Sequence, residues 1–300
     1  MWRKPHTRLI GALAGAALLV GLTACSSSTS AGESPSSASA ATEYQLTKPG
    51  TLTVATNNTS DPFLRSVKDG TVIGFEPDLI RELANRIGIK KVEFVASGFD
   101  TLIAGVGAGK FDVAAAGITG WVPEGGAAAS TVAERSKIVI FTAPHLISPQ
   151  MLISNEEINP GLMSIDDLKP GMKVGAMKAS TGYLWALDNL APKGIDVVAT
   201  TDGSDVQLQS GQLDAFIASM TGAASAKKLY DNIQAGESID ELQVGFCFAI
   251  SPKNEALRDD LDEALRAAVD DGTYKKLFEE YFPGWDVPEL PTEPYKVPAK

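Results

Sequence analysis

Along most of the chain, apolar residues occur either at the spacing of a helix or in short runs typical of strands, and these two patterns alternate. Apolar residues recur every three to four positions at Leu79, Ile80, Leu83 and Ile87, which predicts a helix over Glu76–Ile87. Short apolar runs predict strands at Thr51–Ala55, Val92–Val95, Asp112–Ala116 and Ile138–Thr142, with a second helix at Asp100–Gly107. Strands that alternate with helices in this way predict an α/β fold with a largely parallel sheet.

A second series of the same kind begins near Gln150. Ser164 to Asp167 has the spacing of a capping box, and Ser180 is placed to cap the next helix. The expected strands are Met151–Ser154, Lys173–Ala176, Asp196–Thr200 and Asp214–Ala218, and the expected helices are Thr181–Leu190, Ser204–Ser210 and Thr221–Tyr230. The tail adds a strand and two helices at Leu242–Ser251, Asn254–Asp271 and Tyr274–Tyr281.

The N-terminal segment differs from the rest of the chain. It combines a basic start with an apolar run from Leu9 to Leu22, shorter than the roughly 20 residues that cross a bilayer, so residues 1–24 are predicted to be a signal peptide. Leu22–Cys25 resembles the lipobox of bacterial lipoproteins, which implies lipid attachment at Cys25; the alternative is a plain signal with an incidental cysteine. Residues 25–44 are rich in Ser and Ala and predict a flexible tether. We therefore expect an exported protein, lipid-anchored to the outer face of the cytoplasmic membrane.

Charge and cysteine content narrow the possible partners. Removing residues 1–24 takes away three of the 26 Lys and Arg and none of the 37 Asp and Glu, so the net charge becomes 23 − 37 = −14. An acidic surface argues against a nucleic-acid partner. With Cys25 taken up by the lipid, Cys247 would be the only remaining cysteine, which excludes an intramolecular disulfide, and its apolar surroundings predict a small buried side chain.

Common catalytic and cofactor motifs are missing from the sequence. Gly105–Lys110 is glycine-rich but lacks the Ser or Thr that follows the lysine of a P-loop, so we interpret it as the end of a helix. No Cys, His or Asp spacing is typical of a metal site, and no cofactor is expected. His145 is the only histidine after residue 24; we expect it at the surface or between lobes rather than in acid–base chemistry.

Five segments of the chain carry a resemblance to a known family. They are Gly74–Leu79 (GFEPDL), Phe99–Ile103 (FDTLI), Gly109–Thr119, Arg135–Thr142 (RSKIVIFT) and Asp271–Phe282. In order and spacing they resemble the extracellular solute-binding proteins of polar amino-acid ABC importers, bacterial solute-binding family 3. The match runs from about Thr51 to Gly284.

The resemblance implies a two-lobe, periplasmic-binding-protein type II-like fold with a hinge between the lobes. The first lobe would comprise residues 45–146, the second lobe 147–245, and residues 246–300 would return to the first lobe and form the tail. It also implies a monomer that captures a small carboxylate-bearing solute, an amino acid or an amino-acid derivative. The protein would deliver this solute to the membrane subunits of an ABC permease.

The family's carboxylate site maps onto two parts of this sequence. Arg135 would hold the ligand's α-carboxylate through its planar fork, and the same carboxylate would meet the helix start at Ser180 and Thr181. One anion would thereby contact both lobes and favour their closure. The alternative for Arg135 is a structural pair with Glu134 or another carboxylate.

The ammonium side of the family site is only partly preserved. The resemblance implies that Phe99 packs on the ligand, with core packing as the alternative, and that Gly117 and Thr119 receive the ammonium. The family commonly has an Asp where this chain has Ser219, so the counter-charge for an α-ammonium is missing. A ligand whose amine is substituted, displaced or absent therefore becomes plausible.

An insertion separates Gly117 from Arg135, which the family holds about seven residues apart. We expect this segment to form a loop at the cleft edge. Trp121 in it could cover the ligand, and Glu124 or Glu134 could supply the missing negative charge; the alternative is an exposed insertion without ligand contact.

Two other functions compete with solute capture for transport. One is an enzyme on the same scaffold, such as a dehydratase acting on a small carboxylic acid, for which Glu124, Glu134 and His145 are the candidate acid–base groups. The other is a ligand-sensing module coupled to a signalling partner.

Overall fold

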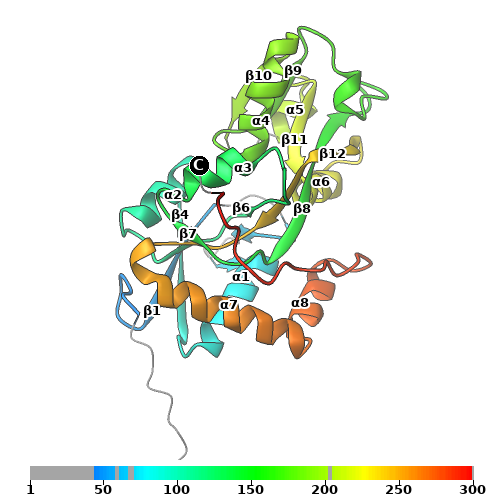
Figure 1. Ribbon diagram of the computed structural model, residues 1–300. Coiled ribbons are helices and arrows are strands. Elements are labelled where there is room, and N and C mark those ends of the chain that lie inside the picture. The colour runs from blue at the N-terminus through cyan, green and yellow to red at the C-terminus, as the bar shows by residue number, and fades with distance from the viewer. Residues whose placement is uncertain (1–43, 58–60, 67–70, 202–204, 299–300) are drawn as a thin grey trace, which may run out of the picture. The chain divides into compact units, whose positions relative to one another are not determined.

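The computed structural model describes residues 44–57, 61–66, 71–201 and 205–298 (Figure 1). The predicted signal peptide, Cys25 and nearly all of the predicted tether lie outside these residues. None of the helices in the described part of the chain is long and apolar enough to cross a membrane.

The first sheet has five strands and its strand order is β4-β1-β5-β13-β7. β1 runs parallel to β4 and β5, whereas β13 is antiparallel to both β5 and β7. The strands are β1 (Thr51–Thr56), β4 (Lys91–Ala96), β5 (Val113–Ala114), β7 (Ile140–Phe141) and β13 (Ala249–Ile250). The helices that pack on them are α1 (Phe75–Arg86), α2 (Phe99–Gly107) and α7 (Glu255–Asp270), and α8 (Thr273–Tyr281) packs on α1 and α7.

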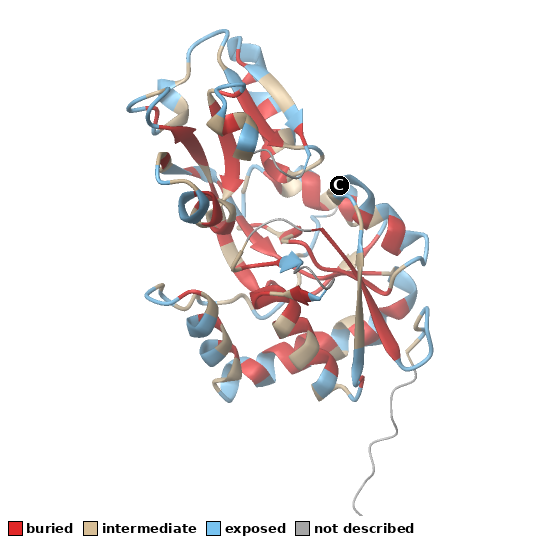
Figure 2. Cartoon of the chain, turned by 180° about the vertical axis from the view of Figure 1, so that it is seen from behind, coloured by how far each residue is buried: buried red, intermediate tan, exposed pale blue. Residues whose placement is uncertain are grey.

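The second sheet has six strands in the order β10-β9-β11-β8-β12-β6. Its strands are β6 (Thr119–Trp121), β8 (Leu146–Asn155), β9 (Lys173–Met177), β10 (Asp196–Thr200), β11 (Ala215–Ser219) and β12 (Ile233–Phe246). Three helices follow the parallel strands β9, β10 and β11: α4 (Thr181–Asn189), α5 (Asp205–Gln209) and α6 (Met220–Leu229). The central strands of both sheets, such as β1 and β11, are largely buried, whereas the edge strands β4 and β10 are mostly intermediate or exposed (Figure 2).

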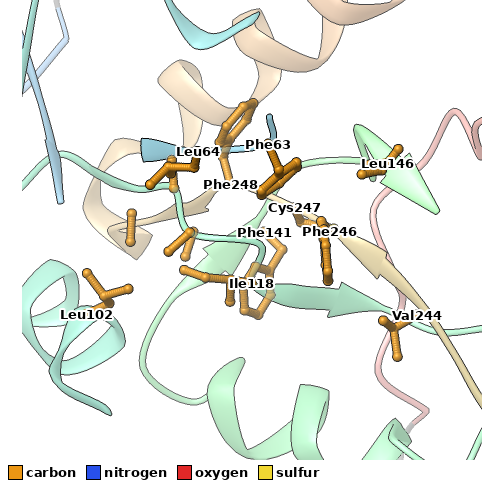
Figure 3. Packing of buried hydrophobic residues seen from close by; sticks show 14 of the residues in the cluster. Phe63, Leu64, Leu102, Ile118, Phe141, Leu146, Val244, Phe246, Cys247 and Phe248 are labelled. Carbon is orange, nitrogen blue, oxygen red and sulfur yellow. The ribbon is translucent and has the colours of Figure 1, made fainter. Parts of the chain in front are cut away.

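The chain passes between the sheets through long antiparallel strands. β8 carries the chain into the second sheet, and β12 pairs along β8 on the way back. Around that return, Phe246, Cys247 and Phe248 pack against Phe63 and Ile118 in one apolar cluster (Figure 3). Cys247 is fully buried, as its apolar surroundings predicted, and burial raises the pKa of its thiol. β13 then joins the first sheet, and the tail helices α7 and α8 pack on α1.

Two sequence-based expectations about the strands need correction. Both sheets are mixed rather than largely parallel, because β8, β12 and β13 run against their neighbours. The single strand expected at Leu242–Ser251 is the end of the longer β12 plus the short β13. Residues 233–241 gave little signal since only Ile233 and Ile239 of that stretch are buried.

The insertion before Arg135 is also more regular than the loop we expected. It contains a helix, α3 (Ala129–Arg135), which buries Thr131, Val132 and Arg135. The strand expected at Ile138–Thr142 is reduced to β7. Arg135 is therefore the last residue of a helix and does not stand directly at the start of a strand.

Candidate functional site

A cavity with a volume of about 130 Å³ is lined by strands of the second sheet and by helices and loops that flank the two sheets. Six of the eight ligand-binding residues predicted from the sequence line this cavity: Phe99, Gly117, Thr119, Ser180, Thr181 and Ser219. Arg135 and Trp121 lie elsewhere. The cavity has room for a small molecule, which residues of both lobes could contact.

The first-lobe wall is fixed by a buried carboxylate. Gly117 has a φ of 61°, in the region that favours glycine, and its amide donates to both carboxylate oxygens of Glu76 at 3.1 and 3.2 Å. A side chain at Gly117 would meet the rings of Phe246 and Phe63 at 3.2 and 3.3 Å. The Gly117 turn is thus held in one conformation at the edge of the cavity.

His145 supports the same wall from the inside. Its Nε2 atom lies 3.0 Å from Glu76 Oε1, its ring stacks on Phe248, and both His145 and Glu76 are fully buried. The expected surface or interlobe position of this histidine is therefore wrong. The His145 side chain can lie in the core because Glu76 provides a partner for its ring nitrogen there.

The second-lobe wall is built from the start of α4. Ala179 takes a φ of 63°, after which the Ser180 hydroxyl caps the helix by accepting from the Tyr183 amide at 3.1 Å. Thr181 is buried, and its hydroxyl has no hydrogen-bond partner among the described residues. The first amides of this helix carry the partial positive charge of its N-terminus, so they favour an anion.

Ser219 is occupied by a structural contact. It is the N-cap of α6, and its Oγ accepts from the Gly222 amide at 3.1 Å and lies 3.0 Å from Thr221 Oγ1. The position that would carry the family's carboxylate is therefore a neutral helix cap. It places the positive end of α6 at the cavity without a counter-charge.

Arg135 lies in a neighbouring hollow that shares Phe99 and Thr181 with the cavity. Only 9% of the residue is exposed. Its Nη1 donates to the Thr119 carbonyl oxygen at 2.8 Å, and its Nη2 donates to the Ala179 carbonyl oxygen at 3.0 Å. The guanidinium thus bridges the start of β6 and the turn that precedes α4.

No carboxylate compensates the charge of Arg135 within the described ranges, where Glu134 pairs with Lys137 instead. Burial lowers the pKa of Arg135 to about 10, so the side chain remains protonated near neutrality. A buried cation held only by two carbonyl oxygens retains unused N–H donors and gains strongly from an incoming anion.

Trp121 does not line the cavity. It lies on β6 opposite Gly245, and it lines a separate hollow with Glu124, Gly125 and the tail residues 291–296 and 298. The segment that was expected to cover the ligand therefore faces the tail at this point.

Several cavity residues were not anticipated from the sequence. Gln150 lies on β8 directly opposite Ser219, and Asp205 begins α5. Phe63, Phe216 and Phe246 add three rings. Asp205 could have been found, because it starts a helix after a parallel strand, as Ser180 does; the rings carried no signal beyond apolar character.

Two sheets linked by crossing strands, with a cavity lined by elements that flank both of them, define a two-lobe solute-binding protein of the periplasmic-binding-protein type, in agreement with the expected fold. The chain belongs to the bacterial extracellular solute-binding proteins, family 3, whose model matches residues 52–284.

Three similar proteins place the chain within that family. The histidine-binding periplasmic protein of Escherichia coli K12 is 27% identical over 255 residues, 81% of this chain and 92% of that protein. A probable amino-acid ABC transporter-binding protein of Haemophilus influenzae is 30% identical over 273 residues, 90% of this chain and 96% of that one. Among solved structures, an ancestral amino acid-binding protein described as a precursor of cyclohexadienyl dehydratase has a TM-score of 0.67 at 29% identity, covering 78% and 96% of the two chains.

Proposed function

We propose that this protein captures a small carboxylate-bearing solute, an amino acid or an amino-acid derivative, outside the cytoplasm and delivers it to an ABC permease. The observation that carries the proposal is the buried guanidinium of Arg135, which lacks a carboxylate partner in the described part of the chain. The amino-acid-binding names of the relatives support the same solute class.

The carboxylate would complete the contacts that the protein leaves open. Two N–H groups of Arg135 already hold the Thr119 and Ala179 carbonyl oxygens, which leaves further donors for an anion. The amide of Thr181 at the start of α4 would meet the same carboxylate from the second lobe. A ligand that contacts both walls stabilises the closed arrangement by its differential affinity for it.

The lobe boundaries and the hinge follow the crossing strands. We propose residues 45–146 as the first lobe, 147–245 as the second, and 246–300 as the return and tail. β8 and β12 would carry the hinge, since they connect the strands of the two sheets. Phe99, Gly117, Thr119, Ser180 and Thr181 would line the ligand, with Ser219 as a neutral neighbour.

Membrane attachment is part of the proposal. Cys25 would carry the lipid after removal of residues 1–24, and the protein would act as a monomer on the outer face of the cytoplasmic membrane. In the native host, Cys25→Ala should release the protein from the membrane fraction. Unchanged membrane association of that variant would contradict lipid attachment.

We propose binding without chemistry. Among the described residues, Asp205 is the only carboxylate that lines the cavity, while His145 lies in the core and Glu124 in another hollow. Glu134 lines the hollow of Arg135, where it is paired with Lys137. An acid–base reaction in the cavity would lack a second titratable group among the described lining residues. A bound ligand should therefore be recovered unchanged after long incubation, and any stoichiometric or catalytic conversion would favour the dehydratase-like alternative.

A thermal-shift screen of amino acids, their derivatives and small organic acids tests the proposal. A ligand at a hundred times its Kd should stabilise the protein by about 2.7 kcal/mol. Arg135→Ala should abolish the shift of the best ligand, whereas Lys137→Ala, an exposed change two residues away, should leave it unchanged. An equal shift in Arg135→Ala would remove this residue from the site.

A further inference from the structure

The α-position of the ligand would lie beside two uncharged side chains, Ser219 and Gln150, and beside the partly positive N-terminus of α6. Ser219 caps the Gly222 amide, so its hydroxyl is already engaged by the protein. Gln150 is opposite Ser219 in the sheet, is 7% exposed, and makes no side-chain hydrogen bond to the described residues. Both groups are uncharged, and the N-terminus of α6 disfavours a nearby cation. An α-ammonium would thus gain little here.

Among the described residues, Asp205 is the only ionisable side chain that lines the cavity, and it lies on a different element. Asp205 begins α5 after β10, the edge strand of the second sheet, whereas Ser219 and Gln150 lie on β11 and β8. Asp205 makes no ion pair or hydrogen bond to another residue of the described chain, and burial raises the pKa of its carboxyl group. Desolvation without a partner leaves a carboxylate that would be stabilised by a cation.

The rest of the cavity suits an apolar spacer. Four phenyl rings, a thioether and two isoleucine side chains line it, from Phe63, Phe99, Ile153, Met177, Phe216, Ile217 and Phe246. Aromatic rings accept both methylene groups and the rim of a cationic head group. The lining therefore combines the start of α4, which favours an anion, with apolar side chains and with one carboxylate that favours a cation.

We propose that the ligand is a carboxylate with a cationic nitrogen at the far end of a short apolar chain and without an α-ammonium. The chemical class is that of ω-amino and ω-guanidino acids. The carboxylate would lie at Thr181 and Arg135 and the cation at Asp205. This inference rests on the proposed function, because it assumes that the same cavity holds a carboxylate.

Two matched sets of compounds test the inference by calorimetric titration. The first is L-lysine, 6-aminohexanoate and L-norleucine; the second is L-arginine, 5-guanidinopentanoate and L-norleucine. Within a set, one comparison removes the α-ammonium and the other removes the distal cation. In at least one set, we expect the deaminated compound to bind no more weakly than its parent and at least ten-fold more tightly than norleucine.

The alternative results separate this inference from the proposed function. Weaker binding of the deaminated compound than of its parent in both sets, or norleucine as the tightest member, would overturn the inference. So would binding of other carboxylates when no member of either set binds. Absence of binding by any carboxylate would instead contradict the proposed function itself.

A variant pair assigns the distal contact. Asp205→Asn should weaken the deaminated cationic acid by about ten-fold and leave norleucine unchanged. Asp196→Asn, an exposed change at the start of β10 on the same lobe, should affect neither. Equal losses for both compounds in Asp205→Asn would show a general structural effect and overturn the assignment of the cation to Asp205.

Discussion

The two ends of the ligand region hold opposite charges in different ways. Arg135 is nine-tenths buried and fixed by carbonyl oxygens at the start of β6 and in the turn before α4, whereas Asp205 is half-buried and makes no ion pair or hydrogen bond to another described residue. The guanidinium is thus preorganised before a ligand arrives, and the carboxylate is free to adapt. We infer that the Arg135 end supplies most of the affinity and that the Asp205 end selects among carboxylates.

The largest effect should come from changing the shape of the cation at Arg135 while keeping its charge. Arg135→Lys removes the planar fork, so one ammonium cannot hold both carbonyl oxygens and a carboxylate in parallel. We expect about a hundred-fold weaker binding of the best carboxylate, or about 2.7 kcal/mol, by calorimetry. A loss of less than three-fold would mean that only the charge matters. Lys137→Arg, at an exposed position, is the matched control.

The next effect concerns the buried contacts of Glu76 with Gly117 and His145. Glu76→Gln keeps the side-chain volume but replaces one acceptor of the buried site with an NH2 group, which cannot accept from the Gly117 amide or His145. We expect a loss of about 1–3 kcal/mol in the free energy of unfolding, measured by urea denaturation. Equal midpoints for the variant and the parent protein would show that this buried contact adds no stability.

A smaller effect should come from adding a negative charge at Ser219, beside the proposed position of the ligand's α-substituent. Ser219→Asp restores a carboxylate beside the α-position and keeps a good N-cap for α6. Ordinary α-amino acids should bind about ten-fold more tightly, equivalent to about 1.4 kcal/mol. Weaker binding of every α-amino acid by this variant would mean that Ser219 does not face the α-substituent.

The smallest effect concerns Asp262, a second carboxylate whose pKa, like that of Asp205, is raised by burial. Asp262 on α7 accepts from the Ala143 amide at 2.7 Å, and burial raises the pKa of its carboxyl group to about 7. Because the folded pKa lies above the unfolded one, its stabilising contribution is complete below about pH 4 and is lost as the pH rises to about 7.

The expected result for Asp262→Asn follows from that direction. The variant should gain stability relative to the parent protein, on the order of 1 kcal/mol, between pH 4 and pH 7. Denaturation curves at a series of pH values measure the difference. A difference that stays constant with pH would contradict the raised pKa. Saturating ligand should leave this pH dependence unchanged, since Asp262 does not line the cavity.

The sequence predicted the parts of the fold that rest on local patterns. The helix periodicity of Leu79 to Ile87 and the cap at Ser180 both lie where they were expected. Strand direction was predicted less well, because a short apolar run is the same whether its neighbours are parallel or antiparallel. The insertion helix escaped notice because its small and polar residues have no clear apolar face.

The site residues, too, could be predicted where short sequence segments determine them and not where contacts between distant segments do. Gly117, Thr119 and Thr181, which line the cavity, could be predicted from the family resemblance of short sequence segments. Gln150 could not, since its place opposite Ser219 depends on strand register. His145 was misplaced because its partner Glu76 lies 69 residues away in the sequence.

The central claim is that a carboxylate from outside completes the buried guanidinium of Arg135. The direct measurement is calorimetric titration of the parent protein with the tightest carboxylate of the screen and with its primary amide, which has the same shape without the charge. We predict that the amide binds at least a hundred-fold more weakly. Equal affinities for the acid and the amide would contradict the claim.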